Sequence, residues 1–196
     1  MLIFDEASHT YWLDGVAVPS VTTIIRPLAP DFSVIPPDVL EAKRLLGTSV
    51  HTACELDDLG ELDDESTDPR VMGYVGAWRA FRRDRGVTIV ANECRLAHAG
   101  LRFAGTLDRV VAEPSGEFWL LDLKTSADPV PSYGVQLAGY ALLLEVADFA
   151  VPRSMKRATV HLRGDGTYKL QAFNDPNDDA AFRACLALYQ WKEQHA

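Results

Sequence analysis

The residues that could carry chemistry lie in the middle of the chain, between Gly105 and Lys124. Asp108 falls in one apolar segment, and the triplet Asp122-Leu123-Lys124 ends the next one. The Pro-Ser-Gly sequence between these segments is typical of a hairpin turn, so paired strands would bring two carboxylates and an ammonium group together. Carboxylates bind hard divalent cations, and a lysine can orient a water or stabilise charge on a phosphate. The pattern therefore favours hydrolysis of phosphodiester bonds.

Each of the two acids also has a simpler interpretation. Asp108 lies among apolar residues, and a buried carboxylate must be paired or bind a cation, so an ion pair with Arg109 or Arg102 would be sufficient. Asp122 follows an apolar run that predicts a buried strand, and strand alternation places it on the same face as Lys124. That pair could be a simple ion pair at the end of a strand. The occurrence of all three residues at hairpin spacing favours a functional site over simple ion pairs.

Other polar residues could join this group. His51 lies in a predicted helix with Glu55 one turn later on the same face, and imidazole is a suitable additional ligand for a cation such as Mn²⁺. Glu93 lies on the predicted strand before Asp108 and could supply a further carboxylate. Gln136 and Tyr140 are one turn apart on the helix after Lys124, where they could hold a phosphate or a water. As alternatives, His51 and Glu93 could be solvated and Tyr140 could fill the core.

Hydrophobic periodicity predicts the elements that would position these side chains. Strands are predicted over residues 88–97, 101–112, 117–124, 157–162 and 168–173, with two short strands on either side of Asp14-Gly15. Helices are predicted over residues 21–26, 38–59, 69–85, 132–146 and 176–193. This order indicates an α/β fold of the mixed α+β type. Because no linker is evident, we predict a single domain over residues 1–196, with the motif-bearing core at about 38–147.

Composition limits the classes of function that the chain can have. Its 196 residues, 47% hydrophobic and 24% charged, suit one globular domain. No apolar run is long enough to span a bilayer, the N-terminal acids are unlike a secretory signal, and three scattered cysteines fit a reducing compartment. We therefore expect a cytoplasmic protein, in a bacterium or a phage-infected host, with no membrane partner.

The net charge of −9 argues against a general nucleic-acid binder, which is usually basic. A metal-dependent nuclease can nevertheless concentrate acids at its site and keep basic residues elsewhere. The clusters that could form such a basic track are Arg79, Arg82, Arg83 and Arg85; Lys43 and Arg44; and Arg153, Lys156 and Arg157. Each cluster could equally be a solvated surface.

Taken in order, the residues described above resemble the PD-(D/E)XK nuclease superfamily, and above all its RecB-type and phage exonuclease-like branch. The resemblance extends from Gly47 to about Leu144 and includes five elements at compatible spacing. These are G-x-x-x-H (Gly47, His51), E (Glu93), G-x-x-D (Gly105, Asp108), D-x-K (Asp122, Lys124) and Q-x-x-x-Y (Gln136, Tyr140).

The resemblance implies a restriction-endonuclease-like core with a mixed central sheet flanked by helices. It also implies a bound Mg²⁺ or Mn²⁺ ion, and the ligands would be His51, Asp108, Asp122, the Leu123 carbonyl and Glu93. Lys124 would be the catalytic lysine, and Gln136 and Tyr140 would support the site and contact DNA. Whether one or two ions act is open, since Glu93 or Glu55 could help hold a second.

The function expected from this resemblance is that of a metal-dependent exonuclease acting on linear, end-bearing DNA in recombination, repair or processing. One alternative is an endonuclease of the same fold. Another is a non-catalytic DNA-binding protein that keeps the fold, although such proteins usually lose an acid or the lysine. A homo-oligomer or a recombination partner protein is left open.

Overall fold

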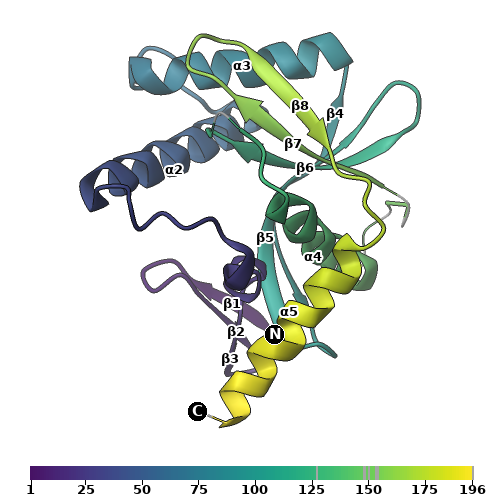
Figure 1. Cartoon of the computed structure of the whole chain (residues 1–196). Helices are drawn as coiled ribbons and strands as arrows, with labels where there is room; N and C mark the ends of the chain where they lie inside the picture. The colour runs from purple at the N-terminus through teal and green to yellow at the C-terminus, as the bar shows by residue number, and fades with distance from the viewer. Residues whose placement is uncertain (127, 148, 150, 153–154, 196) are drawn as a thin grey trace.

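A five-stranded sheet forms the centre of the protein in the computed structural model, which describes residues 1–126, 128–147, 149, 151–152 and 155–195 (Figure 1). The strands lie in their sequence order, and only the β6–β7 pair is parallel. They are β4 (Thr88–His98), β5 (Phe103–Ala112), β6 (Phe118–Lys124), β7 (Lys156–Leu162) and β8 (Tyr168–Ala172). Because β6 and β7 are parallel, the chain must cross over between them, and a helix makes this connection.

Helices cover both faces of the sheet, as an apolar two-sided sheet requires. The long helices α2 (Pro37–Leu59) and α3 (Pro69–Arg85) enclose one hydrophobic core with β6 and β7. A second core lies on the other face, between the sheet and α1 (Val21–Ile24), α4 (Ser132–Val146) and α5 (Asp178–His195). The predicted mixed α/β fold, with a mixed central sheet flanked by helices, is confirmed.

A small antiparallel sheet of three strands precedes α1, namely β1 (Leu2–Asp5), β2 (Thr10–Leu13) and β3 (Val16–Val18). It contacts β5 directly: the Ala104 N–H donates to the Pro19 carbonyl at 3.0 Å, and the Tyr11 and Thr106 hydroxyls are 2.7 Å apart. The sequence predicted β2 and β3 but not β1. That residues 1–196 form one domain stays a prediction.

The predicted elements agree with the structure to within a few residues, with two informative differences. The strand expected from residue 101 begins at Phe103, because Arg102 has a positive φ of 56° in the turn before it. The helix expected over residues 21–26 ends at Ile24 and continues as a 3-10 turn, η1 (Arg26–Leu28), that contains Pro27. The hairpin predicted between β5 and β6 is confirmed, and Gly116 there takes the left-handed conformation with φ of 84°.

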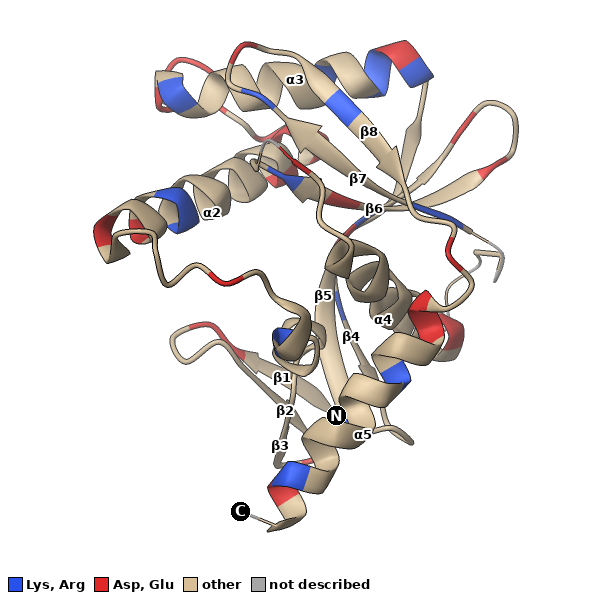
Figure 2. Ribbon diagram, in the orientation of Figure 1, with Lys and Arg blue, Asp and Glu red and all other residues tan. Residues whose placement is uncertain are grey.

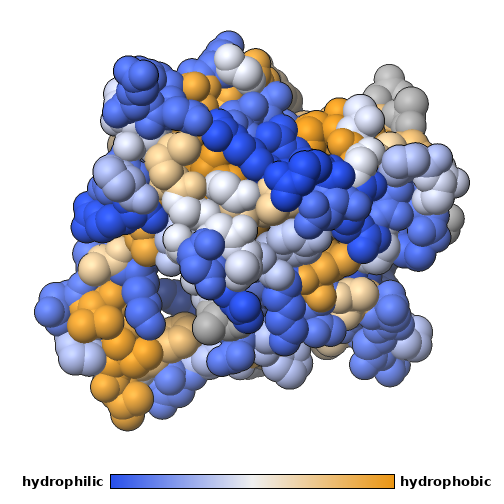
Figure 3. Space-filling view, turned by 90° about the horizontal axis from the view of Figure 1, so that it is seen from above, coloured by the Kyte–Doolittle hydropathy of each residue, from blue (hydrophilic) through white to orange (hydrophobic). Residues whose placement is uncertain are grey.

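Charged and hydrophobic residues are interspersed over the surface. Basic and acidic residues lie close together on α2 and α3 (Figure 2). Seen from the side of α3 and β8, hydrophobic residues occur in separate patches among hydrophilic ones (Figure 3). Among the described helices, none is both long and apolar enough to cross a membrane.

Candidate active site

Asp108 lies inside β5, at the point where β5 and β6 separate. The backbone ladder between these strands ends at the pair Arg109–Leu121, and one step further the Leu123 N–H donates to Asp108 Oδ2 at 2.7 Å. Asp108 is not at the end of its strand, because β5 continues to pair with β4 as far as Phe103. Beyond the pair Arg109–Leu121 the two strands no longer pair, and the Asp108 carboxylate lies between them. Its side chain is only 9% exposed.

Asp122 and Lys124 point to the α4 face of the sheet, as strand alternation predicted, while Leu121 and Leu123 enter the core under α2 and α3. Lys124 Nζ lies 2.6 Å from Asp122 Oδ2 and donates to Gln136 Oε1 at 3.2 Å. Gln136 Nε2 donates to Asp122 Oδ1 at 3.0 Å and to the Tyr140 hydroxyl at 3.2 Å. An ammonium group cannot accept and a carboxylate cannot donate, so these partners fix the orientation of the Gln136 amide.

The close approach of α4 depends on Gly105. A Cβ at this position would lie 3.0 Å from Tyr140 Cε1 and 3.3 Å from Leu143 Cδ1, tighter than nearly all real contacts. Glycine therefore lets α4 pack onto β5, and this packing brings Gln136 and Tyr140 to the acids. Gly47 has no such role, because its Cβ would make only an ordinary contact of 3.6 Å with Thr125.

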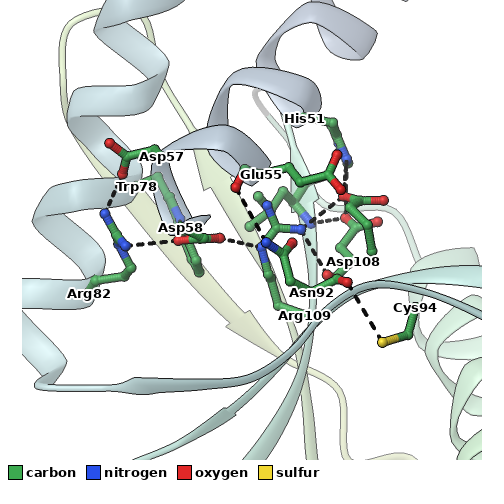
Figure 4. A network of polar contacts seen from close by, with 12 residues as sticks. His51, Glu55, Asp57, Asp58, Trp78, Arg82, Asn92, Cys94, Asp108 and Arg109 are labelled. Carbon is green, nitrogen blue, oxygen red and sulfur yellow. Dashed lines mark hydrogen bonds and ion pairs between the residues drawn. The ribbon is translucent and has the colours of Figure 1, made fainter. Parts of the chain in front are cut away.

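Three ligand atoms on three different elements lie close together, and Figure 4 shows two of these side chains, His51 and Asp108, facing each other. His51 Nδ1 on α2 lies 3.5 Å from Asp108 Oδ2 and 3.9 Å from Glu93 Oε1 on β4. All three atoms lie within 4.8 Å of one another. His51 Nε2 is 3.0 Å from the Leu123 carbonyl, which can only accept, so Nε2 carries a proton. This contact orients the ring with Nδ1 towards the carboxylates.

The electrostatics of this cluster are those of a cation site. Burial opposes charge on His51, but the carboxylates of Asp108 and Glu93 outweigh it and raise the pKa of His51 to about 9. Burial raises the pKa of both Asp108 and Asp122. Lys124 is also buried, but the neighbouring carboxylates of Asp122 and Asp108 raise its pKa, so it keeps its proton. The acids thus draw a positive charge to the position between them.

The structure brings together every residue that the sequence singled out for the site, with differences in their contacts. Among the described residues, the group of clustered ligand atoms contains His51, Glu93 and Asp108 but neither Asp122 nor Glu55. Asp122 instead contacts Lys124 and Gln136. The roles of these residues as metal ligands or catalytic groups stay predictions.

The arginines expected to form a basic track on α3 are paired with acids. Arg79 contacts Asp57 and Asp64, Arg82 contacts Asp57 and Asp58, and Arg85 contacts Glu113. Only Arg83 is strongly exposed, and it lies 3.3 Å from its neighbour Asp84. Of the other two clusters, Arg44, Lys156 and Arg157 also pair with acids, and Arg153 lies outside the described residues.

A cavity of about 550 Å³ opens beside the site, and sequence reasoning missed it. Gln136 and Tyr133 form its wall towards Lys124, whose Nζ lies 4.6 Å from the centre of the Tyr133 ring. The opposite walls come from the loop after α1 and from α2, and they include Arg26, Phe32 and Lys43. Within the described chain, neither Arg26 nor Lys43 forms an ion pair with an acid. No local sequence pattern predicts this cavity, because the residues that line it are far apart in the chain.

Comparison with known proteins identifies the family. A family model of the PD-(D/E)XK nuclease superfamily matches residues 65–193, which includes Glu93, Asp108, Asp122, Lys124 and the Gln136–Tyr140 pair. No curated protein matches the chain. Sixteen chains from solved structures match it.

One of these solved structures is the crystal structure of SSO0001, at 17% sequence identity and a TM-score of 0.36. The match covers 59% of this chain and 56% of the SSO0001 chain, so this chain spans little more than half the length of SSO0001. The family model, in contrast, extends over well more than half of the chain. The chain therefore belongs to the PD-(D/E)XK nuclease superfamily.

Proposed function

We propose that this protein is a Mg²⁺- or Mn²⁺-dependent deoxyribonuclease that degrades linear DNA from its ends. The observation that carries the proposal is the convergence of His51, Glu93 and Asp108 beside the Asp122–Lys124 pair. A set of acids next to a lysine that keeps its proton is suited to phosphodiester hydrolysis.

The residues present fit a hard divalent cation. Asp108 and Asp122 are buried acids whose pKa burial raises, and carboxylate oxygens are the preferred ligands of Mg²⁺ and Mn²⁺. We propose that the ion is held by the carboxylates of Asp108, Asp122 and Glu93, the His51 imidazole and the Leu123 carbonyl. When bound, such an ion supplies a water of lowered pKa and neutralises charge on the phosphate.

Lys124 is positioned to orient the attacking water or to stabilise negative charge on the phosphate. Its ion pair with Asp122 and its hydrogen bond to Gln136 hold the ammonium group in one place. Tyr140 keeps its proton, because burial raises the pKa of its hydroxyl, and it supports Gln136 from behind. Gln136 and Tyr140 therefore act as supporting groups for the acid and lysine, with Gln136 also facing the cavity.

We propose that the cleaved strand enters through the cavity that Gln136 and Tyr133 share with the site. Its volume of about 550 Å³ is within the range of ligand pockets and would admit an unpaired nucleotide more readily than an intact duplex. Phe32 and Tyr133 offer aromatic surfaces for a base, while Arg26 and Lys43 can meet phosphates. A duplex would have to fray at its end to enter, and this favours an exonuclease over the alternative of an endonuclease.

Replacing Arg26 and Lys43 together with glutamine should weaken binding of a labelled single-stranded oligonucleotide in EDTA. The slope of log affinity against log salt should become shallower by about 1.4, because two phosphate contacts are lost. The matched control is Arg70→Gln with Arg83→Gln, which removes the same charge from exposed positions on α3. An equal loss in the control would mean that the effect is one of total charge.

The proposed function is tested with linear and covalently closed circular DNA, each with and without Mg²⁺ or Mn²⁺. We expect end-labelled linear DNA to be shortened progressively, closed circles to persist, and EDTA to stop the reaction. Rapid linearisation of circles would support the endonuclease instead. Binding of DNA without any cleavage under these conditions would support a non-catalytic protein that keeps the fold.

A role in DNA recombination, repair or processing in the cytoplasm of a bacterium or a phage-infected host is the setting we propose for this activity. A homo-oligomer or a recombination partner protein would fit the same setting. Size-exclusion chromatography with light scattering measures the first of these directly.

A further inference from the structure

We propose that Asp58 and Arg109 are positioning residues that hold the Glu93 carboxylate in place for the metal ion. The inference rests on the proposed metal site, and it assigns a role to a buried charge network that is distinct from the ligands (Figure 4). The network links α2 and α3 to the two strands that carry Glu93 and Asp108.

Arg109 is the link to the site. It is fully buried on β5, next in sequence to Asp108, but it makes no contact with the Asp108 carboxylate. Instead, Arg109 Nη1 donates to Glu93 Oε1 and to the Asp108 carbonyl, at 2.9 and 2.8 Å. The same oxygen of Glu93 is the one that faces His51 Nδ1. Arg109 therefore fixes both the carboxylate of Glu93 and the backbone at Asp108.

Asp58 in turn fixes Arg109. Its side chain is 1% exposed, and its Oδ2 accepts from Arg109 Nε at 2.6 Å. The other oxygen, Oδ1, accepts from the Trp78 indole N–H at 2.8 Å and contacts Arg82 Nη1 at 2.9 Å. The guanidinium groups of Arg82 and Arg109 both lie 5.8 Å from the Trp78 ring. With both oxygens engaged, Asp58 has one orientation, and so does Arg109.

The backbone at Glu93 is a second, independent sign that its position matters. Glu93 has a positive φ of 46° in the middle of a strand, a conformation that non-glycine residues rarely adopt. It lies between two residues that pair with β5, in a strand whose register also shifts between Ile89 and Ala91. Such strain persists when the surroundings enforce it, and it is concentrated at functional sites. Arg109 and the distorted backbone together aim the carboxylate at His51 and Asp108.

Stability of the fold alone would not require charged residues at Asp58 and Arg109. Buried ion pairs are often replaceable by apolar residues without loss of stability, because desolvation offsets the attraction. The value of the network then lies in the fixed orientation of Glu93. Partners that orient metal ligands commonly contribute 10–100-fold to metal affinity.

The experiment compares Asp58→Asn with Asp57→Asn, two neighbouring acids on α2. Both contact Arg82 and both are buried, with side chains 1% and 7% exposed, but only Asp58 contacts Arg109. Mn²⁺ binding to the DNA-free protein is measured by calorimetry. We expect Asp58→Asn to weaken Mn²⁺ binding about 10-fold and Asp57→Asn to change it less than twofold. Equal losses in both variants, or no loss in Asp58→Asn, would overturn the proposal.

A double-mutant cycle shows whether the effect passes through Glu93. In a Glu93→Gln background, Asp58→Asn should have no further effect on Mn²⁺ affinity, because the carboxylate that it orients is gone. Arg109→Lys gives the same test if Asp58→Asn fails to fold, since lysine keeps the charge but cannot bridge Asp58 and Glu93. Additive losses in the cycle would overturn the proposal. Absence of Mn²⁺ binding in the unaltered protein would instead contradict the proposed function itself.

Discussion

Replacing Asp108 with asparagine should abolish DNA cleavage, with a fall in kcat/KM of about 10³-fold or more. The carboxylate is the central member of the ligand cluster, since it lies 3.5 Å from His51 and also accepts the Leu123 N–H. Asparagine keeps the size of the side chain and can still accept that hydrogen bond, so the edge of β6 should stay in place. Only the charge that attracts the metal ion is lost.

The stability of the Asp108→Asn variant distinguishes this loss from misfolding. Because burial raises the pKa of Asp108, its charged form opposes folding at neutral pH, and the variant should melt near or above the temperature of the unaltered protein. Asp165→Asn, in the exposed turn between β7 and β8, is the control and should cleave DNA normally. Robust cleavage by Asp108→Asn would show that the site is assigned wrongly.

Replacing Lys124 with methionine should lower the single-turnover rate by about 10²–10³-fold, the usual effect of losing one group that stabilises the transition state. Mn²⁺ binding should be retained, because a lysine that keeps its proton cannot ligate a metal ion. Methionine keeps an unbranched apolar stem of similar shape beside Tyr133 but lacks the ammonium group that contacts Gln136. The result separates the chemical step from the binding of metal and DNA.

Two measurements check this separation. Calorimetry with Mn²⁺ and binding of DNA in EDTA should give similar values for Lys124→Met and for Lys169→Met, an exposed lysine on β8. Only Lys124→Met should be slow when enzyme is in excess over DNA. If Lys124→Met lost Mn²⁺ affinity by as large a factor as it lost single-turnover rate, Lys124 would act by holding Asp122 in place.

The sequence was sufficient for the features that depend on local pattern. The alternation in β6 placed Asp122 and Lys124 on one face, and the turn signal at residues 114–116 correctly paired β5 with β6. The one-turn spacing of Gln136 and Tyr140 placed them together, and both are buried at the site. Such regularities repeat within a few residues, so no tertiary information is needed to interpret them.

The remaining features depend on contacts between distant segments. The sequence of α3 is compatible with a basic track of arginines, because nothing in that helix shows that Asp57 and Asp58 lie opposite. Arg109 is a candidate partner for Asp108 because the two are neighbours in the sequence, but its guanidinium pairs instead with Asp58 and Glu93. The cavity beside Gln136 is assembled from segments more than a hundred residues apart, as Phe32 and Tyr133 illustrate. Only the folded chain defines such pairings.

Because His51 retains a proton, the order of folding and metal binding can be predicted. With a pKa of about 9, the imidazolium serves as a counter-ion for Asp108 and Glu93 in the metal-free protein. The chain can therefore fold before it binds a metal ion. Its contribution to stability is complete below about pH 6.5, the unfolded pKa, and is lost as the pH rises through about 9. Metal and proton compete for the same position. The gain in melting temperature on adding Mn²⁺ should therefore widen between these two pH values, so alkaline pH would favour the metal-bound protein.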